Sequence, residues 1–201
     1  TGQTGQREQR DHKELCAKAR EDIKLSISYN SDNAQVLFSY GLMLLLDGQC
    51  QEAIGYFDRS LRLKPDEPEI YLRGAMAYDL RADMDVYTPD ECNRIVQDCT
   101  EAEKLGAESN AKLYALRAKH IFNNHEMFAD ANKGPLFDVK QAIRDLTRAI
   151  ELGENRVEVF FLRAMCYQVT QEPTRALEDI QQVKQLDPVF FAQISQLPSP
   201  Q

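Results

Sequence analysis

Apolar residues recur at spacings of three and four along most of this chain, which is the periodicity of amphipathic helices. Residues 8–28 form one such stretch, with Leu15, Ala19, Ile23 and Ile27 on a common stripe. The two-residue alternation that is typical of half-buried strands is nearly absent. The pattern therefore predicts an all-α protein.

A close pair of helices is expected next, over residues 36–44 and 53–61. Asp47-Gly48 supplies turn residues between them, and Pro65 ends the second helix because proline lacks a backbone N–H group. Counted from Gly41, positions 12, 16, 19 and 24 further on hold small, aromatic, small and proline residues: Ala53, Phe57, Ser60 and Pro65. Small residues let two helix backbones approach closely, and the aromatic ring fills the space beside them.

The same spacing recurs near the C-terminus and, with insertions, in between. Ala164 is followed at those four distances by Ala176, Ile180, Val183 and Pro188. The copies that begin at Gly74 and Ala118 match the repeat spacing only if they contain about nine and about twelve extra residues, respectively. Three of the four copies also share a phrase of Leu, Arg and a small residue: Leu72-Arg73-Gly74, Leu116-Arg117-Ala118 and Leu162-Arg163-Ala164.

This spacing resembles the tetratricopeptide repeat, a helix–turn–helix unit of about 34 residues. The resemblance covers roughly residues 8–195 and implies an all-α, right-handed solenoid of about four repeats, with a leading helix and a C-terminal capping helix. The predicted parts are a disordered extension, a half repeat, four repeats and a disordered tail: residues 1–7, 8–33, 34–66, 67–110, 111–156, 157–190 and 196–201.

The two insertions are predicted to be loops between the helices of the second and third pairs. Thr88-Pro89-Asp90-Glu91 reads as a capping box with proline at the first helical position, and Asp138 is a weaker start signal. The helices that follow should end at Gly106 and Gly153. The loops, over 81–88 and 123–137, are expected to lie side by side as a second contact surface or to pack on each other. Their hydrophobic residues include Tyr87, Met127, Phe128 and Phe137.

The resemblance also implies a concave groove lined by the first helix of each pair. The helical spacing around each small residue gives the groove candidates: Phe38, Leu42, Tyr71, Tyr78, Lys112, Lys119, Phe122, Asn123, Phe161 and Met165. Such an apolar, aromatic groove with two lysines suits a peptide or helix with hydrophobic anchors and an acidic group. The alternative is that these apolar side chains only pack against neighbouring helices.

Chaperone-binding members of the family grip a partner's C-terminal carboxylates with Lys, Asn and Arg residues on the first helices. Lys112 matches one of these places. Leu116 and Leu72, however, stand where Arg and Asn would be required. The resemblance therefore argues against a carboxylate clamp of this kind.

The repeated arginines Arg73, Arg117 and Arg163 have two interpretations. They could form a ladder for acidic partners. The favoured interpretation is structural, with ion pairs to acidic residues of neighbouring helices around Asp98, Asp145 or Asp179.

The amino-acid composition argues against some classes of partner and indicates a cellular compartment. The net charge of −8 disfavours nucleic acid and anionic membrane surfaces, which need a basic stripe. No apolar run is long enough for membrane insertion. Five widely spaced cysteines, an odd number without a C-x-x-C pair, favour reduced thiols and a cytoplasmic location, with a cytoskeletal or ciliary assembly as a narrower option.

The sequence contains few residue patterns typical of catalysis or metal binding. The sequence contains no G-x-S-x-G elbow, no phosphate-binding glycine loop and no H-E-x-x-H motif, so no catalytic residue, enzyme activity or cofactor is predicted. His120, His125, Glu126 and Asp130 are the nearest to a metal set. The five-residue step between the two histidines does not place both on one helix face, so no metal site is predicted.

The main functional prediction is a non-enzymatic protein–protein interaction scaffold, part of a larger protein because the chain lacks an initiator Met. Its partner would be a protein or peptide. Two alternatives stay open: a regulatory or targeting module of a larger enzyme or co-chaperone, and a self-assembling module that forms a homo-oligomer through its half repeat and Phe190-Phe191.

Overall fold

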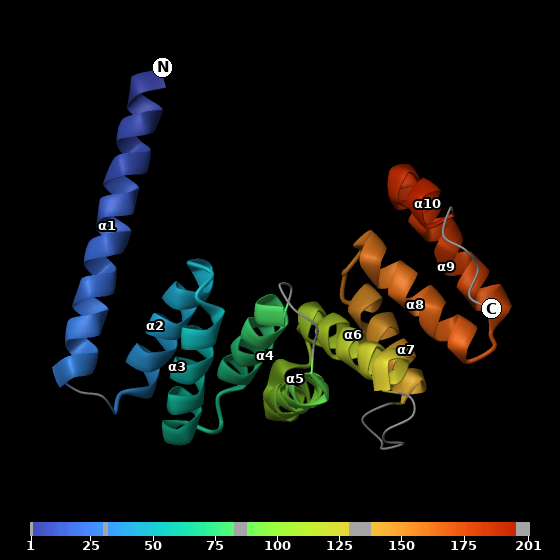
Figure 1. The fold of residues 1–201 in the computed structure, drawn as a ribbon, viewed down its shortest axis with the longest axis horizontal. Helices are drawn as coiled ribbons and strands as arrows, with labels where there is room; N and C mark the ends of the chain where they lie inside the picture. Colours follow the sequence, from blue (N-terminus) through green and yellow to red (C-terminus); the bar gives the residue numbers. More distant parts are fainter. Residues whose placement is uncertain (1, 30–31, 83–87, 129–137, 196–201) are drawn as a thin grey trace. The chain divides into compact units, whose positions relative to one another are not determined.

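The computed structural model of the chain describes residues 2–29, 32–82, 88–128 and 138–195. Their regular elements are helical throughout (Figure 1), so the predicted all-α fold is confirmed. The helices are α1 (Gly2–Tyr29), α2 (Ala34–Leu46), α3 (Cys50–Leu63), α4 (Pro68–Ala82), α5 (Pro89–Ala102), η1 (Glu103–Ala107), α6 (Ala111–Phe128), α7 (Val139–Glu151), α8 (Val157–Val169), α9 (Pro173–Leu186) and α10 (Pro188–Ile194).

The chain divides into two compact units, residues 1–85 and 86–201. In the first unit, α1 packs on α2, α2 on α3, and α3 on α4. In the second unit the same neighbour-to-neighbour packing runs from α5 to α10. The helix pairs with the most extensive contacts are α2–α3, α6–α7 and α8–α9. Each of these pairs is one helix–turn–helix unit of the kind that the sequence predicts.

Packing between α2 and α3 follows the spacing found in the sequence. Gly41 lies directly against the Phe57 ring, which is almost completely buried. Ala53 and Ser60 are buried on the same face of α3, and the Ser60 hydroxyl donates a hydrogen bond of 2.7 Å to the Ala34 carbonyl. The small residues therefore let the two backbones approach, and the aromatic ring occupies the space that they leave.

The core of the second unit is built in the same way. Ala118 of α6 packs with Ala142 and Leu146 of α7 in one apolar cluster, and all three are fully buried. Ala164 of α8 and Ala176 of α9 are buried at the corresponding places of the last pair. Small residues at fixed spacing therefore mark the helix contacts in both units.

Local capping chemistry sets the helix ends. Thr88 and Glu91 form the predicted capping box, with bonds of 2.9 and 3.3 Å between side chain and backbone. The Asp138 carboxylate accepts a hydrogen bond of 3.0 Å from the Lys140 amide at the start of α7. Gly153 follows the end of α7 with a φ of 95°, and Gly106 interrupts the helical backbone within η1 with a φ of 103°. Glycine adopts this left-handed conformation at low cost.

Two predicted boundaries are wrong. Helix α1 begins at Gly2, so residues 2–7 are not a disordered extension. Once a helix has formed, each further residue adds a hydrogen bond, and Gln3, Gln6 and Arg7 favour the helical state, which offsets the glycines at positions 2 and 5. Helix α6 continues to Phe128, so Met127 and Phe128 lie in a helix rather than in a loop. Tyr87, Phe137 and the predicted tail over 196–201 lie outside the described residues.

The terminal helices differ in how much of their apolar surface is covered. Ile23 and Ile27 of α1 pack against the core of the first unit, whereas Leu15, on the same predicted stripe, is 73% exposed. In the second unit, α10 packs on α9, and the Phe190 ring meets the Phe161 ring of α8 edge-on at 5.5 Å. The predicted terminal helix therefore covers part of the last pair.

Candidate peptide-binding surfaces

In unit 1, α2 and α4 are each the first helix of a predicted pair, and they contact each other. The surface that these two helices share is the first-helix face of the unit. Leu42 and Tyr78 are half-buried and pack at the edge of the core, and the Arg81 guanidinium lies 5.1 Å from the centre of the Tyr78 ring. Tyr71 is also half-buried, and its hydroxyl donates to the Pro65 carbonyl at 3.1 Å. Phe38 differs, because it is buried with its ring 5.8 Å from that of Phe57. This face thus presents the edges of an aliphatic and two aromatic side chains.

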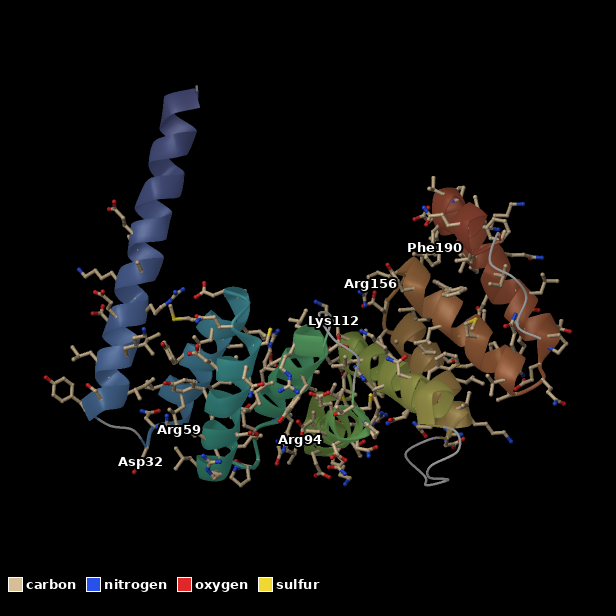
Figure 2. All side chains as sticks on the ribbon, viewed as in Figure 1. Asp32, Arg59, Arg94, Lys112, Arg156 and Phe190 are labelled. Carbon is tan, nitrogen blue, oxygen red and sulfur yellow. The ribbon has the colours of Figure 1, made fainter. Side chains whose placement is uncertain are left out.

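The first-helix face of unit 2 is formed by α6 and α8, which also contact each other. Lys112 is exposed in the first turn of α6 (Figure 2), and Lys119 is half-buried two turns later. Asn123 is half-buried, whereas Phe122 is buried in the apolar core. This face combines amino groups with a small apolar area.

Two groove candidates on α8 complete that face. Met165 is half-buried and packs against the core, and Phe161 is half-buried beneath the Phe190 ring. Figure 2 shows Phe190 on α10 near the beginning of α8. The structure thus brings the candidates of α2 and α4 together in one unit and those of α6 and α8 together in the other. A single groove along all four helices stays a prediction.

Arg117 is a buried charged side chain of the second unit and has an ion-pair role. Its Nε and Nη2 atoms donate to the two oxygens of Asp145 at 2.7 and 2.8 Å, and Nη1 donates to Glu103. Burial alone would lower the pKa of Arg117, but the hydrogen bonds and charges of Asp145 and Glu103 raise it above its ordinary value. The guanidinium is therefore always charged and held in one orientation.

The same arrangement recurs one repeat later. Arg163 donates to both oxygens of Asp179 at 2.8 and 2.7 Å and to the Thr147 hydroxyl at 3.1 Å. As for Arg117, burial alone would lower the pKa of Arg163, and Asp179 raises it. The structural interpretation is thus confirmed for two of the three repeated arginines. Arg73 donates to Glu69 of its own helix at 2.7 Å, and its pairing with Asp98, which lies in the other unit, stays a prediction.

A cavity in the second unit was not expected from the sequence. It lies between α5, α6 and α7, has a volume of about 520 Å³, and is lined in part by Tyr114, Arg117, Arg144 and Arg148. The Tyr114 hydroxyl donates to Glu103 at 3.1 Å, and burial, followed by this bond, raises the pKa of Tyr114. In the sequence, the feature that could have indicated this cavity is the pair Arg144 and Arg148, one turn apart on α7. It points to a cavity only once the helices adjacent to α7 are known.

Within the ranges given above, no group of three or more His, Cys, Asp or Glu side chains is placed to bind a metal ion. His120 is fully buried, and the side chains of His125, Glu126 and Asp130 are outside the described residues. Among the helices described, none has both the length and the apolar character to cross a membrane.

Known proteins resemble the chain mainly in fold. No protein-family model matches it. The DnaJ homolog subfamily C member 7 of Mus musculus and that of Homo sapiens are each 24% identical over 160 residues, which is 79% of this chain. The chain spans about a third of the length of these curated relatives, 31% in both cases.

Solved structures cover more of the chain at lower identity. MamA from Desulfovibrio magneticus RS-1, solved from residue 41 to its end, matches with a TM-score of 0.65 and 15% identity, over 91% of this chain and 88% of the solved chain. A tetratricopeptide-repeat protein of Thermus thermophilus has a TM-score of 0.55 and 15% identity, over 94% and 95% of the two chains. The first such domain of Spaghetti (RPAP3), solved with the HSP90 peptide SRMEEVD, has a TM-score of 0.53 and 22% identity, over 71% and 96%. Together with the helix pairs and the spacing of their small residues, these likenesses show that the chain has the fold of the tetratricopeptide-repeat proteins.

Proposed function

We propose that the chain is a non-enzymatic protein-interaction module that holds a peptide or a helix of a partner protein against its first-helix faces. The observation that carries this proposal is the incomplete burial of Leu42, Tyr71, Tyr78 and Met165. The small residues that hold the helix pairs together, such as Ala118 and Ala164, are buried. These four large apolar residues keep part of their surface accessible, as anchoring surfaces in peptide-binding proteins do.

The two faces offer different chemistry to a partner. The face of α2 and α4 is aliphatic and aromatic, and it suits hydrophobic anchor residues. The face of α6 and α8 carries Lys112 and Lys119, which suit an acidic group. A peptide with apolar and acidic residues would match both.

A co-chaperone module is a second candidate, because one structural neighbour holds an HSP90 peptide and the curated relatives are DnaJ homologs. Two residues argue against a carboxylate clamp. Leu72 is buried and Leu116 is half-buried, at the places that would need Asn and Arg. Neither can donate a side-chain hydrogen bond to a carboxylate. The proposal therefore places binding on the apolar and aromatic edges rather than on a clamp.

We also propose that the chain belongs to a larger protein in a particular cellular compartment. The chain would serve as one segment of a larger cytoplasmic protein, with a cytoskeletal or ciliary assembly as the narrower form. Self-association through Phe190-Phe191 is a further option, although Phe190 already packs on Phe161. Light scattering at rising protein concentration tests it, and a strict monomer excludes it.

The binding proposal is tested with peptides selected by display on the full chain and then measured by fluorescence anisotropy. Tyr78→Ala and Lys119→Glu should each weaken selected peptides by about tenfold or more, the effect of losing an anchor residue. The matched controls are Tyr29→Ala, on the exposed side of α1, and Lys140→Glu, exposed on α7. Equal effects of the controls and the groove variants would overturn the assignment of the faces.

The peptide SRMEEVD separates the two candidates. We expect weak binding that Lys112→Ala barely changes, because one lysine does not make a clamp. Tight binding that Lys112→Ala abolishes would favour the co-chaperone module instead.

A further inference from the structure

A cavity lies between α5, α6 and α7, away from the first-helix faces. Its volume of about 520 Å³ far exceeds the roughly 30 Å³ that one water molecule occupies in the liquid, so it has room for a side chain and its neighbours. Val96 and Ile121 give it an apolar floor, and both are buried. It lies wholly within the second unit, and its lining includes none of the groove candidates named above.

One wall of the cavity is a fixed and satisfied polar network. Asp145 binds both Arg117 and the Gln141 amide, the latter at 2.8 Å. Glu103 binds Arg117 and the Tyr114 hydroxyl. Arg117 supplies one positive charge against the two negative charges of Asp145 and Glu103, so this network carries a net charge of −1 and defines the shape of the cavity. Arg144 and Arg148 bring the sum over the charged lining residues to +1.

The remaining charged residues are Arg144 and Arg148, on successive turns of α7. Their side chains are 60% and 46% exposed, and each has a carboxylate partner at 3.2 Å, Asp138 and Glu151 respectively. Arg144 also donates to the Gln141 amide oxygen at 2.6 and 3.1 Å, and Arg148 also interacts with the Tyr114 hydroxyl. Both partner carboxylates are themselves exposed. Exposed ion pairs contribute little to stability, so either guanidinium can exchange its partner for another carboxylate at small cost.

Comparison with the next repeat shows that these two arginines are not part of the repeat fold. Asp179 lies 34 positions after Asp145 and plays the same role toward Arg163. The same step from Arg144 and Arg148 leads to Glu178 and Gln182. The buried ion pair therefore recurs, whereas the pair of arginines at the cavity does not. A feature that packing does not require is a candidate for ligand binding.

From this we infer that the α5–α6–α7 cavity binds an acidic side chain of a partner peptide, with the carboxylate between the Arg144 and Arg148 guanidinium groups and the aliphatic stem over Val96 and Ile121. Guanidinium groups bind carboxylates through paired hydrogen bonds. The apolar floor favours a glutamate or aspartate within a peptide over a bare anion. The site lies outside the proposed first-helix faces and does not depend on them.

The test uses the full chain with the acetylated and amidated tripeptide Glu-Leu-Glu, followed by NMR of the arginine Nε–H groups and of the Thr100 and Gln141 amides. We expect saturable shifts at Arg144 and Arg148 at millimolar peptide. The neutral tripeptide Gln-Leu-Gln should leave these signals unchanged, and inorganic phosphate should shift them without saturation in the same range.

Variants locate the binding. Arg144→Gln combined with Arg148→Gln should weaken the tripeptide at least fivefold, as reported by the Thr100 and Gln141 amides. Arg156→Gln, whose side chain is 63% exposed and pairs with Glu154, is the matched control and should have no effect. Lys119→Glu should also leave these shifts unchanged, which separates this site from the groove.

Three results would overturn the inference. Equal shifts with the glutamate and glutamine tripeptides would show that charge is not recognised. An unchanged affinity in the double variant would place binding elsewhere. Phosphate that binds as tightly as the tripeptide would show a simple anion site rather than one for an acidic side chain.

Discussion

Replacing Gly41 by alanine tests the packing that defines the helix pair. A Cβ atom at Gly41 would lie 2.7, 2.9 and 3.2 Å from three ring atoms of Phe57. Ordinary contacts between carbon atoms are about 3.5–4.0 Å, so the ring would have to move by several tenths of an ångström. The ring is only 1% exposed and packs on Phe38, so it has little freedom to move.

The expected loss of stability is the difference between two effects. Overpacking a core costs about 1–3 kcal/mol. Alanine in place of glycine within a helix gains up to about 1 kcal/mol, because the unfolded chain loses freedom. With the full gain subtracted from the cost, Gly41→Ala should destabilise the protein by about 0–2 kcal/mol.

Gly55 supplies the matched control. It lies within α3, is exposed, and has no atom within 4 Å of the Cβ position. Gly55→Ala should thus stabilise the protein by about 0.5–1 kcal/mol. Urea unfolding followed by circular dichroism gives both free energies. Phe57→Leu replaces the ring by a smaller side chain and should therefore reduce the loss of unfolding free energy caused by Gly41→Ala. A double-mutant cycle measures this reduction. If Gly41→Ala is as stable as Gly55→Ala, the close approach of α2 and α3 is refuted.

Three further predictions concern the second unit and its caps. Arg117→Met leaves the buried Asp145 carboxylate without its cation and should cost about 3–5 kcal/mol in urea unfolding, whereas Arg175→Met, at an exposed pair, should cost at most about 1 kcal/mol. Thr88→Ala removes the capping box and should cost about 1 kcal/mol, while unchanged stability would show that the cap is not needed. The raised pKa of Tyr114 implies a stabilisation that is present below about pH 10 and is lost as the pH rises further, so Tyr114→Phe should make alkaline unfolding less steep.

Much of the fold was readable from the sequence because its signals are local. The periodicity of apolar residues predicts each helix within its own turns, and the capping residues Thr88 and Asp138 act on amides two or three positions away. The spacing from Gly41 to Phe57 predicts a helix pair because the connecting turn is too short to allow another partner. The errors at Gly2 and Phe128 arose where a helix continues through residues without a clear stop signal.

The tertiary structure decided what the side chains do. By sequence alone Arg117 could serve a partner or the fold, and it pairs with Asp145 only because α6 and α7 are adjacent across an insertion that carries no periodicity. Phe122 and Met165 looked alike as groove candidates, yet one is buried and the other half-exposed. The cavity beside Arg144 exists because three helices meet there. Short-range spacing thus determines the helices and their pairing, and the repeat suggested which acidic residues the arginines would meet. Burial, the geometry of the ion pairs and the cavity depend on contacts between residues far apart in the chain, which no local pattern encodes.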